Sequence, residues 1–516
     1  MTKLIASIIA LIFCLSLSAQ SYNILDFGAV ADGNTINTES IQKTIDKCNA
    51  NGGGIVYIPT GTFITGTINL KSNVNLYLES GATLKGSSNM NDYAPFERSG
   101  YGPSNYGMLF TLKAENVSIT GTGTIDGNEE AFFIWDKAKK IEWGGTKFTR
   151  QGENFRKVES GIGDGPLEPL PRPRQMVIFS QCKNVLVENV KISKSPFWTL
   201  HFADCDGVIV KGVKIWNSLE TPNCDGMDIT SCSNVSVSDC DIRAGDDAIA
   251  ITGYALHFEL PGYYLLAHAS ENINITNCNL QSRSSGIRIG FLDQNTIRNI
   301  NISNINITNS NRGIGIFLRD SGSIENVIIS NVNIDTRLHT GDWWGNGEPI
   351  HISAIRGKEN VKLGKIRNIK FDHINCKSEN GFLLYGTEES NLENIEFHNV
   401  TFEFADSKLN DVAGGNIDLR GCLGDDKQLF QRDLPAFLAQ YITGLTIENF
   451  RLVWTNTRMP YFTNGIEVTN FNGLRIRNFK GTASPLNPKA SPIFLENGCQ
   501  ADVDTKIGVL KKNVKK

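Results

Sequence analysis

The chain has no marked excess of either charge and no cysteine pattern that binds a metal. Its 516 residues include 54 acidic and 50 basic residues, giving a net charge of -4. No global field therefore attracts nucleic acid or an anionic membrane. None of the 11 cysteines forms a CxxC pair, which argues against the usual structural zinc sites. We predict a protein without metal, without another cofactor and without a nucleic-acid partner.

Long apolar runs are also scarce. After residue 19 no stretch has the roughly 18 uninterrupted apolar residues of a membrane-spanning helix, so no span is expected. The apolar run at 4–17 follows Lys3 and precedes Ser18 and Ala19, a pattern typical of a secretory signal peptide. We expect cleavage near Ala19, a secreted or periplasmic product, and ten remaining cysteines that are buried thiols or form a few disulfides.

The sequence is rich in a repeated unit of short β-branched runs. The unit is Asn-(Val/Ile)-x-(Val/Ile)-x-x-(Val/Ile/Cys)-x-(Ile/Leu), and several copies lie 23 to 27 residues apart. Runs such as 185–192 are typical of short strands. The period matches one coil of a parallel β-helix, while the leucine spacing of leucine-rich repeats is missing. The copies begin at Asn116, Asn184, Asn234, Asn272, Asn299, Asn326, Asn368 and Asn394, with Gly207 in the Asn place of one copy.

The repeat predicts an all-β fold, a right-handed single-stranded parallel β-helix. A helix over residues 40–49, with apolar residues at helical spacing and glycines behind it, is expected to cap the N-terminal end. The signal peptide at 1–19 would then be followed by a single solenoid domain at 20–516.

Insertions interrupt the repeat near 129–175, 253–270 and 337–348. Loops on one side of a regular scaffold commonly carry binding residues. We therefore expect these insertions to form the walls of a cleft, and Trp343 and Trp344 to contact a substrate there.

Two acidic segments of the chain are separated by about one coil. Asp225 and Asp246 are 21 residues apart, and Asp247 follows directly. A β-helix would bring them to neighbouring rungs, about 4.8 Å apart along the axis. Crowded carboxylates raise at least one pKa, which creates a proton donor beside an ionised group, as glycoside hydrolysis requires. At this point an acidic turn that binds calcium or faces solvent remains the alternative.

Several segments resemble glycoside hydrolase family 28, the polygalacturonase family. Their order along the chain is the family's order, and the resemblance runs from Tyr22 to about 348–352. The segments similar to the entry region of the family are 25–33 (LDFGAVADG), 40–48, 52–54 and 70–78, and those similar to its later motifs are 195–201 (SPFWTLH), 223–226 and 245–247.

The resemblance implies inverting hydrolysis of a glycosidic bond in a pectin-like, galacturonate-containing polysaccharide, without a cofactor. On the matching positions Asp246 would be the general acid, and Asp225 and Asp247 would hold and deprotonate the attacking water. Asn223 would orient the cluster. Asp228 is either a supporting carboxylate or part of a structural turn.

Two departures from the family pattern concern cationic residues. Where the family carries Gly-His-Gly this chain has Ser-Ser-Gly at 284–286, and where the family carries Arg-Ile-Lys it has Gly-Ile-Phe at 315–317. Both family motifs are associated with gripping a galacturonate carboxylate. Arg288 is the expected replacement, because a guanidinium binds a carboxylate or sulfate bidentately. Arg312 and Arg319 are weaker candidates for this role, and we expect them to be solvated.

Of the histidines, His201 and His351 are the candidates for substrate contact. The expected substrate is a polysaccharide or oligosaccharide, attacked from a chain end if the insertions close the groove, by a protein acting as a monomer. Three alternatives remain open. They are a hydrolase of another acidic or sulfated polysaccharide, a polysaccharide lyase that uses calcium and a Lys or Arg base, and a non-catalytic carbohydrate-binding solenoid.

Overall fold

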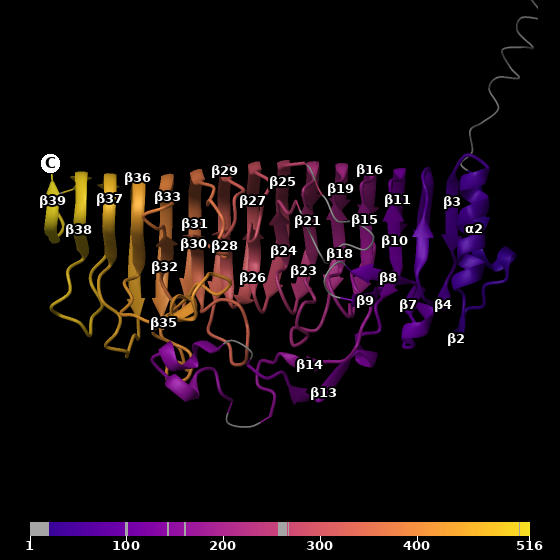
Figure 1. Ribbon diagram of the computed structural model, residues 1–516, viewed down its shortest axis with the longest axis horizontal. Helices are drawn as coiled ribbons and strands as arrows, with labels where there is room; N and C mark the ends of the chain where they lie inside the picture. The colour runs from indigo at the N-terminus through magenta and orange to yellow at the C-terminus, as the bar shows by residue number, and fades with distance from the viewer. Residues whose placement is uncertain are drawn as a thin grey trace, which may run out of the picture.

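The structure, a computed structural model, describes residues 20–98, 102–141, 144–158, 161–255, 266, 268–504 and 506–515. The chain forms one long stack of parallel strands (Figure 1). The predicted signal peptide at 1–19 and most of the insertion at 253–270 lie outside the described residues.

Three ladders of strands run along the stack, and each strand pairs in parallel with the strand one coil away. The first ladder contains β5 (Ile68–Leu70), β10 (Leu109–Leu112), β15 (Val177–Ser180), β18 (Leu200–Ala203), β21 (Met227–Thr230), β24 (Ile249–Thr252), β26 (Ser285–Ile289), β28 (Arg312–Leu318), β30 (Glu348–Ala354) and β32 (Phe382–Tyr385). The second contains β1 (Ser21–Asn23), β3 (Gly54–Ile58), β6 (Val74–Leu78), β11 (Glu115–Gly121), β16 (Lys183–Glu188), β19 (Asp206–Lys211) and β22 (Ser233–Ser238). The third contains β2 (Asp32–Ile36), β4 (Gly61–Thr65), β7 (Ala82–Gly86), β12 (Thr124–Asp126), β17 (Lys191–Ser193), β20 (Lys214–Trp216) and β23 (Asp241–Ala244).

Later coils join the second and third ladders into longer, bent strands. These are β25 (Ser270–Ser282), β27 (Ile297–Ser310), β29 (Ile324–Thr336), β31 (Ile366–Ser378) and β33 (Leu392–Ala405), and the stack ends with β36 (Phe437–Thr455), β37 (Ile466–Arg477), β38 (Ile493–Val503) and β39 (Val509–Lys515). The predicted parallel β-helix is therefore confirmed.

The recurring asparagines explain why successive coils have the same shape. Asn272, Asn299 and Asn326 have φ of 57°, 58° and 58°, the left-handed conformation that asparagine tolerates better than most residues. Their side chains also form a ladder, since the Nδ2 of Asn299 and that of Asn326 each donate over 3.3 Å to the Oδ1 of the asparagine one coil before. Inward-pointing isoleucines and valines between these turns fill the core.

The N-terminal end is capped by helix α2 (Thr38–Ala50). The side chains of Ile41, Ile45 and Cys48 are buried against the first coil. A cap is needed because an open end of a solenoid leaves apolar core residues in water. The helix predicted at 40–49 is thus present, and all ten cysteines among the described residues are free thiols, nine of them buried.

The shorter elements lie outside the three ladders, in loops and in the insertion at 129–175. They are β8 (Pro95–Arg98), β9 (Gly102–Asn105), β13 (Phe133–Ala138), β14 (Leu167–Pro169), β34 (Asn416–Asp418), β35 (Leu429–Gln431), α3 (Asp425–Gln428) and the 3-10 turns η1 (Ile24–Phe27), η2 (Met90–Asp92), η3 (Glu129–Ala131), η4 (Gly144–Phe148) and η5 (Gly152–Asn154).

The insertion that follows β12 runs along one edge of the stack to coils much later in the sequence (Figure 1). The backbone N–H of Arg150 donates to Oδ1 of Asn416 over 2.7 Å, and Nε2 of Gln151 donates to the carbonyl of Asn410 over 2.8 Å. One edge of the first ladder is thereby walled by a single long insertion.

Candidate active site

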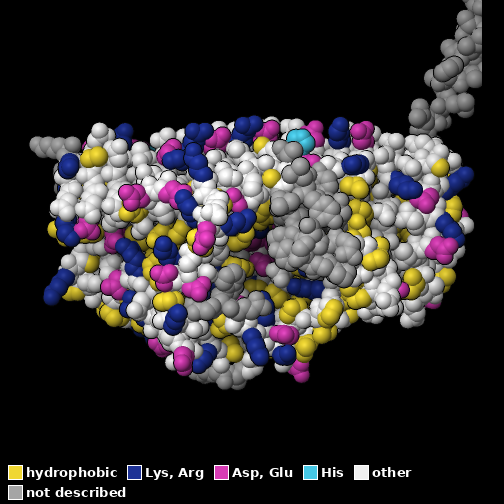
Figure 2. Space-filling view, in the orientation of Figure 1, with side chains coloured by type: hydrophobic (Ala, Val, Ile, Leu, Met, Phe, Trp, Pro, Cys, Tyr) yellow, Lys and Arg dark blue, Asp and Glu magenta, His cyan; other side chains and the backbone are white. Residues whose placement is uncertain are grey.

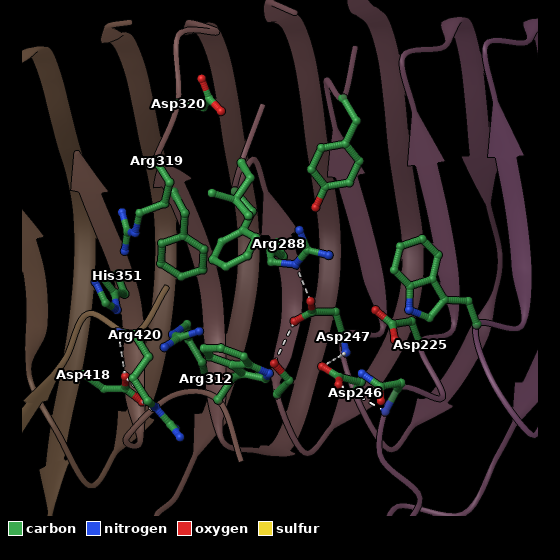
Figure 3. Close-up of a pocket in the computed structure, with 18 of the residues that line it drawn as sticks. Asp225, Asp246, Asp247, Arg288, Arg312, Arg319, Asp320, His351, Asp418 and Arg420 are labelled. Atoms are coloured by element: carbon green, nitrogen blue, oxygen red, sulfur yellow. Dashed lines mark hydrogen bonds and ion pairs between the residues drawn. The ribbon is translucent and has the colours of Figure 1, made fainter. Parts of the chain in front are cut away.

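Three aspartates converge at the N-terminal ends of two neighbouring strands. Asp225 lies just before β21, and Asp246 and Asp247 lie just before β24, which pairs with β21 with Met227 opposite Ile249. One carboxylate oxygen from each aspartate lies within 4.8 Å of the other two. The three residues are 3%, 7% and 4% exposed. The 21-residue spacing between Asp225 and Asp246 therefore brings the three aspartates together on neighbouring rungs, as expected (Figure 3).

The contacts of Asp246 and Asp247 differ in kind. Asp246 accepts backbone N–H groups from Asn223 at 3.3 Å and from Asp247 at 3.1 Å. Asp247 accepts the Oγ–H of Ser284 at 2.9 Å and the N–H of Ser285 at 3.0 Å, and it forms an ion pair with Arg288. The Ser-Ser segment thus holds Asp247 in place beside its guanidinium partner.

These contacts separate the proton affinities of the carboxyl groups. Burial, with the charge of Asp247 beside it, raises the pKa of Asp246 to about 7. Burial also opposes ionisation of Asp247, but Arg288 and the hydrogen bonds from the serines outweigh it and lower the pKa of Asp247. The pKa of Asp225 is raised by burial and then by Asp246 and Asp228. A carboxylate therefore lies beside groups that retain protons near neutral pH.

The aspartates form part of the wall of a cavity of about 890 Å³, within the range of small-ligand sites. Among the residues that line it are six arginines, Arg172, Arg174, Arg288, Arg312, Arg319 and Arg420, and six aromatic residues, Phe197, Trp198, Tyr254, Phe291, Phe317 and Trp344. On the face seen in Figure 2 acidic and basic side chains are interspersed without a large patch of one sign.

Trp344 and His351 line the cavity, as expected, but Trp343 and His201 do not. Trp343 is 1% exposed and its Nε1–H donates to the carbonyl of Asp164 over 3.3 Å. It packs into the insertion because consecutive residues in this loop point to opposite sides. His201 is fully buried behind Trp198, with its Nε2 3.0 Å from Oγ1 of Thr230. Neither position supports the substrate contact expected from the sequence.

Asn223 and Asp228 occupy different positions around the trio. Asn223 lines the cavity and accepts a hydrogen bond at Oδ1 from Arg172 over 3.1 Å. Asp228, on β21, is 2% exposed and is not among the lining residues, but it raises the pKa of Asp225. Burial also raises the pKa of Asp228 itself, so Asp228 and Asp225 compete for protons rather than sharing a binding role in the cavity.

The arginines also differ from expectation. Arg312 and Arg319 are 4% and 1% exposed, so the expectation that they are solvated is wrong. Both lie close to the Phe317 ring, with their guanidinium carbons 4.8 and 5.5 Å from its centroid. Arg288 lines the cavity but is already paired with Asp247.

Sequence reasoning did not identify Arg172, Arg174 or Arg420 as cavity residues. The first two belong to a Pro-Arg-Pro-Arg segment at 171–174, whose alternation of proline and arginine in an insertion was the available signal. Arg420 comes from a late coil and pairs with Asp418 and Asp342, and its guanidinium lies 5.1 Å from the Trp344 ring centroid. No local pattern marked it.

Comparison of the sequence with models of known protein families assigns the chain to a glycosidase family, in agreement with the cluster of three aspartates. The sequence model of glycosyl hydrolases family 28 matches residues 48–413. The chain belongs to family 28. The expected enzyme class, a glycosidase, is confirmed at the level of this family, and so is the fold class.

Curated relatives of this family 28 protein include a "Probable polygalacturonase" of Vitis vinifera, 27% identical over 263 residues, which are 48% of each chain. Another is an "Exo-poly-alpha-D-galacturonosidase" of Dickeya chrysanthemi, 29% identical over 44% of this chain and 41% of its own length. The match thus spans about half the length of these relatives. A solved exopolygalacturonase of Thermotoga maritima shares the fold, with a TM-score of 0.60, 24% identity, and coverage of 75% of this chain and 88% of its own.

For this family 28 chain, a membrane span was not expected. Among the described residues, none of the helices has both the length and the apolar character needed to cross a bilayer.

Proposed function

We propose that the protein is a secreted glycosidase that cleaves glycosidic bonds in a pectin-like, galacturonate-containing polysaccharide by an inverting mechanism, acting from a chain end as a monomer without a cofactor. The observation that carries this proposal is the pairing of an ionised Asp247 with a proton-holding Asp246 in a cavity rich in arginine. The apolar leader at 4–17 supports secretion.

In the proposed reaction Asp246 gives its proton to the glycosidic oxygen as the bond from that oxygen to the anomeric carbon breaks. A water molecule attacks the anomeric carbon from the other side, and Asp247 takes the proton of that water while Asp225 helps to hold it. One carboxylate oxygen from each of the three aspartates lies within 4.8 Å of the other two. A single water molecule can therefore form hydrogen bonds of about 2.8 Å with two of these carboxyl groups at once.

The spacing of the carboxyl groups makes the stereochemical outcome a sharp test. A closest-oxygen separation within 4.8 Å is smaller than the roughly 6.5 to 9.5 Å between carboxyl groups in most inverting glycosidases. NMR of the first product formed should give the anomer opposite to that of the substrate linkage. A retained anomer would instead make one of the aspartates a covalent nucleophile.

The preference for an acidic polysaccharide rests on the cavity charges. Arginine binds planar carboxylates through two parallel hydrogen bonds, and these are strong where water is excluded. The same chemistry fits a sulfate ester, so a hydrolase of a sulfated polysaccharide is the second candidate.

Action from a chain end is supported by the insertion that forms a wall along one edge of the stack. In this insertion Arg150 forms an ion pair with Asp433 at 2.8 Å.

The test is an incubation of the purified protein with polygalacturonate, esterified pectin and sulfated polysaccharides, followed by analysis of product length. We expect single units or very short oligosaccharides from polygalacturonate, without added calcium. Asp246→Asn is the matched control and should release no reducing ends. A calcium-dependent reaction that gives an unsaturated sugar would show that the protein is a lyase and not a hydrolase. Absence of cleavage of every substrate would favour a non-catalytic carbohydrate-binding solenoid.

A further inference from the structure

The family's cationic motifs are absent, and Arg288 does not replace them by itself. Its Nε–H group donates to Asp247, and Nη1 donates to the carbonyl of Gly290 over 3.3 Å. The ion pair with Asp247 is inside the cavity wall, where the side chain of Arg288 is 12% exposed. Because this guanidinium already neutralises the carboxylate of Asp247, a charged substrate has to be recognised elsewhere.

Arg319 is a buried cation without a matching carboxylate. It is 1% exposed and lines the cavity. Its guanidinium donates to the carbonyls of Leu318 and Ser353, both at 3.1 Å, and to the Oγ of Ser353 at 2.9 Å, all uncharged acceptors, and its Nε has no partner. Among the described residues none forms an ion pair with Arg319. A buried charge left unpaired is costly, so a bound anion would supply what the free protein lacks.

Burial does not discharge this group. The pKa of Arg319 falls to about 10, chiefly through desolvation, so the guanidinium remains cationic at neutral pH. Hydrogen bonds from three of its five N–H groups hold it in one position, which leaves a fixed charge at the cavity wall.

Arg312 provides a second guanidinium beside the same aromatic ring. Its Nε forms a long ion pair of 3.8 Å with Oε2 of Glu348 and has no hydrogen-bond partner, while Nη1 donates to Oγ of Ser285 over 3.3 Å. Both guanidinium groups lie close to the Phe317 ring. We name Arg312 and Arg319 the distal arginine pair, since Arg312 begins β28 and Arg319 follows its last residue, two rungs beyond β24 along the axis.

Gly315 explains how this arrangement is built. A Cβ at position 315 would lie 2.5 Å from Cζ of Phe317, far inside van der Waals contact. Only glycine lets the Phe317 ring lie over position 315, close to both arginines. The Gly-Ile-Phe at 315–317, which departs from the family's Arg-Ile-Lys, therefore belongs to a different arrangement of cations on the same strand.

His351 adds a polar group to the same part of the cavity. It lies opposite Gly315 in the register of β28 and β30. Its Nδ1 is 3.5 Å from Oε1 of Glu348, which favours a proton on Nδ1, and its Nε2 has no partner. Burial lowers the pKa of His351 to about 4, so the ring is neutral and Nε2 is a buried hydrogen-bond acceptor that is unused in the structure.

We propose that the distal arginine pair binds the anionic substituent, a carboxylate or a sulfate ester, of a sugar unit that lies toward the C-terminal coils from the scissile bond. The pair is about 10 Å along the axis from the rung of Asp246 and Asp247, given about 4.8 Å for each rung. Figure 3 shows Arg288 between the aspartates and the group formed by Arg312, Arg319 and His351. The proposal rests on the proposed function, because it assigns an acidic sugar to the same cavity.

Binding, measured apart from catalysis, tests this assignment. In the Asp246→Asn background, calorimetry with a galacturonate oligosaccharide should give a dissociation constant about 10- to 100-fold higher when Arg319→Met is added, as expected for the loss of a hydrogen-bonded charge pair. With the methyl-esterified oligosaccharide the two proteins should differ less than about threefold. The same titration with a sulfated oligosaccharide distinguishes a carboxylate from a sulfate ester as the natural ligand. The dissociation constant of the anion that fits the site should rise more when Arg319 is replaced.

Two further variants keep the test decisive. Gly315→Ala should weaken binding of the acidic oligosaccharide by displacing Phe317, even if Arg319→Met folds poorly. Arg367→Met removes an exposed arginine of β31 that pairs with Glu325 outside the cavity, and it should change nothing. Equal losses for acidic and esterified ligands, or no binding of any acidic oligosaccharide by the parent, would overturn the proposal. If the wild type still cleaved neutral or esterified substrates, the anion-binding proposal would fail while the proposed glycosidase activity would be retained.

Discussion

The buried Asp246 should make the protein less stable as the pH rises, and replacing it should remove that loss. Its pKa is raised from 3.8 to about 7 by burial and by Asp247. A group whose pKa is higher in the folded state contributes its full stability below the unfolded pKa, and this contribution is lost as pH rises through the folded pKa. The relevant window is therefore about pH 4 to 7.

The size of the effect follows from that pKa. Keeping the carboxyl buried costs about 1.7 kcal/mol of unfolding free energy at pH 5 and about 4 kcal/mol at pH 8. Asp246→Asn avoids this cost but loses one hydrogen bond, because the amide cannot accept from the N–H groups of both Asn223 and Asp247. That loss is about 1 kcal/mol and does not depend on pH.

Scanning calorimetry at pH 5 and pH 8 measures the difference. Relative to wild type, the Asp246→Asn variant should gain about 2.5 kcal/mol more stability at pH 8 than at pH 5. For a chain of this length that corresponds to a difference of about 2 to 3 °C in the Tm shift, since one kcal/mol moves the Tm by about 1 °C. An equal Tm shift at both pH values would show that Asp246 is ionised in the folded protein, and the general-acid assignment would fail.

The remaining predictions concern the pH profile and individual side chains. Activity should decline as pH rises through about 7, because Asp246 then loses its proton, and a profile that still climbs at pH 8 would exclude it as the acid. Asp247→Asn should lower kcat at least about 1000-fold and destabilise the protein by about 3 to 5 kcal/mol, measured by denaturant unfolding, because Arg288 is left buried and unpaired. Trp344→Ala should raise KM without changing the Tm greatly. Trp343→Ala should lower the free energy of unfolding by about 3 to 5 kcal/mol, because Trp343, unlike Trp344, is fully buried. The reverse pattern would place Trp343 at the substrate.

Much of the architecture could be predicted because its causes are local. Asparagine at the turns and alternating β-branched residues specify each coil, and the period of the repeat specifies how the coils stack. The convergence of Asp225 with Asp246 followed from that period alone. Their proton affinities did not, since the low pKa of Asp247 depends on Arg288 from a later coil.

The insertions were the least predictable part of the molecule. Trp343 and Trp344 are adjacent and chemically alike, yet one is buried in the loop and the other faces the cavity. Arg312 and Arg319 resembled ordinary surface residues because nothing near them in the sequence shows that both pack against Phe317. Arg420 reaches the cavity through its pairing with Asp342, 78 residues earlier.

By itself the sequence determined the coil, its stacking and the meeting of three carboxyl groups, because these depend on spacings within one or two repeats. Only the tertiary structure decided which carboxyl is ionised, which tryptophan meets the cavity and that Arg319 is buried at the cavity wall beside uncharged acceptors. Those outcomes depend on burial and on charges contributed by distant coils, and neither quantity is encoded in a local run of residues.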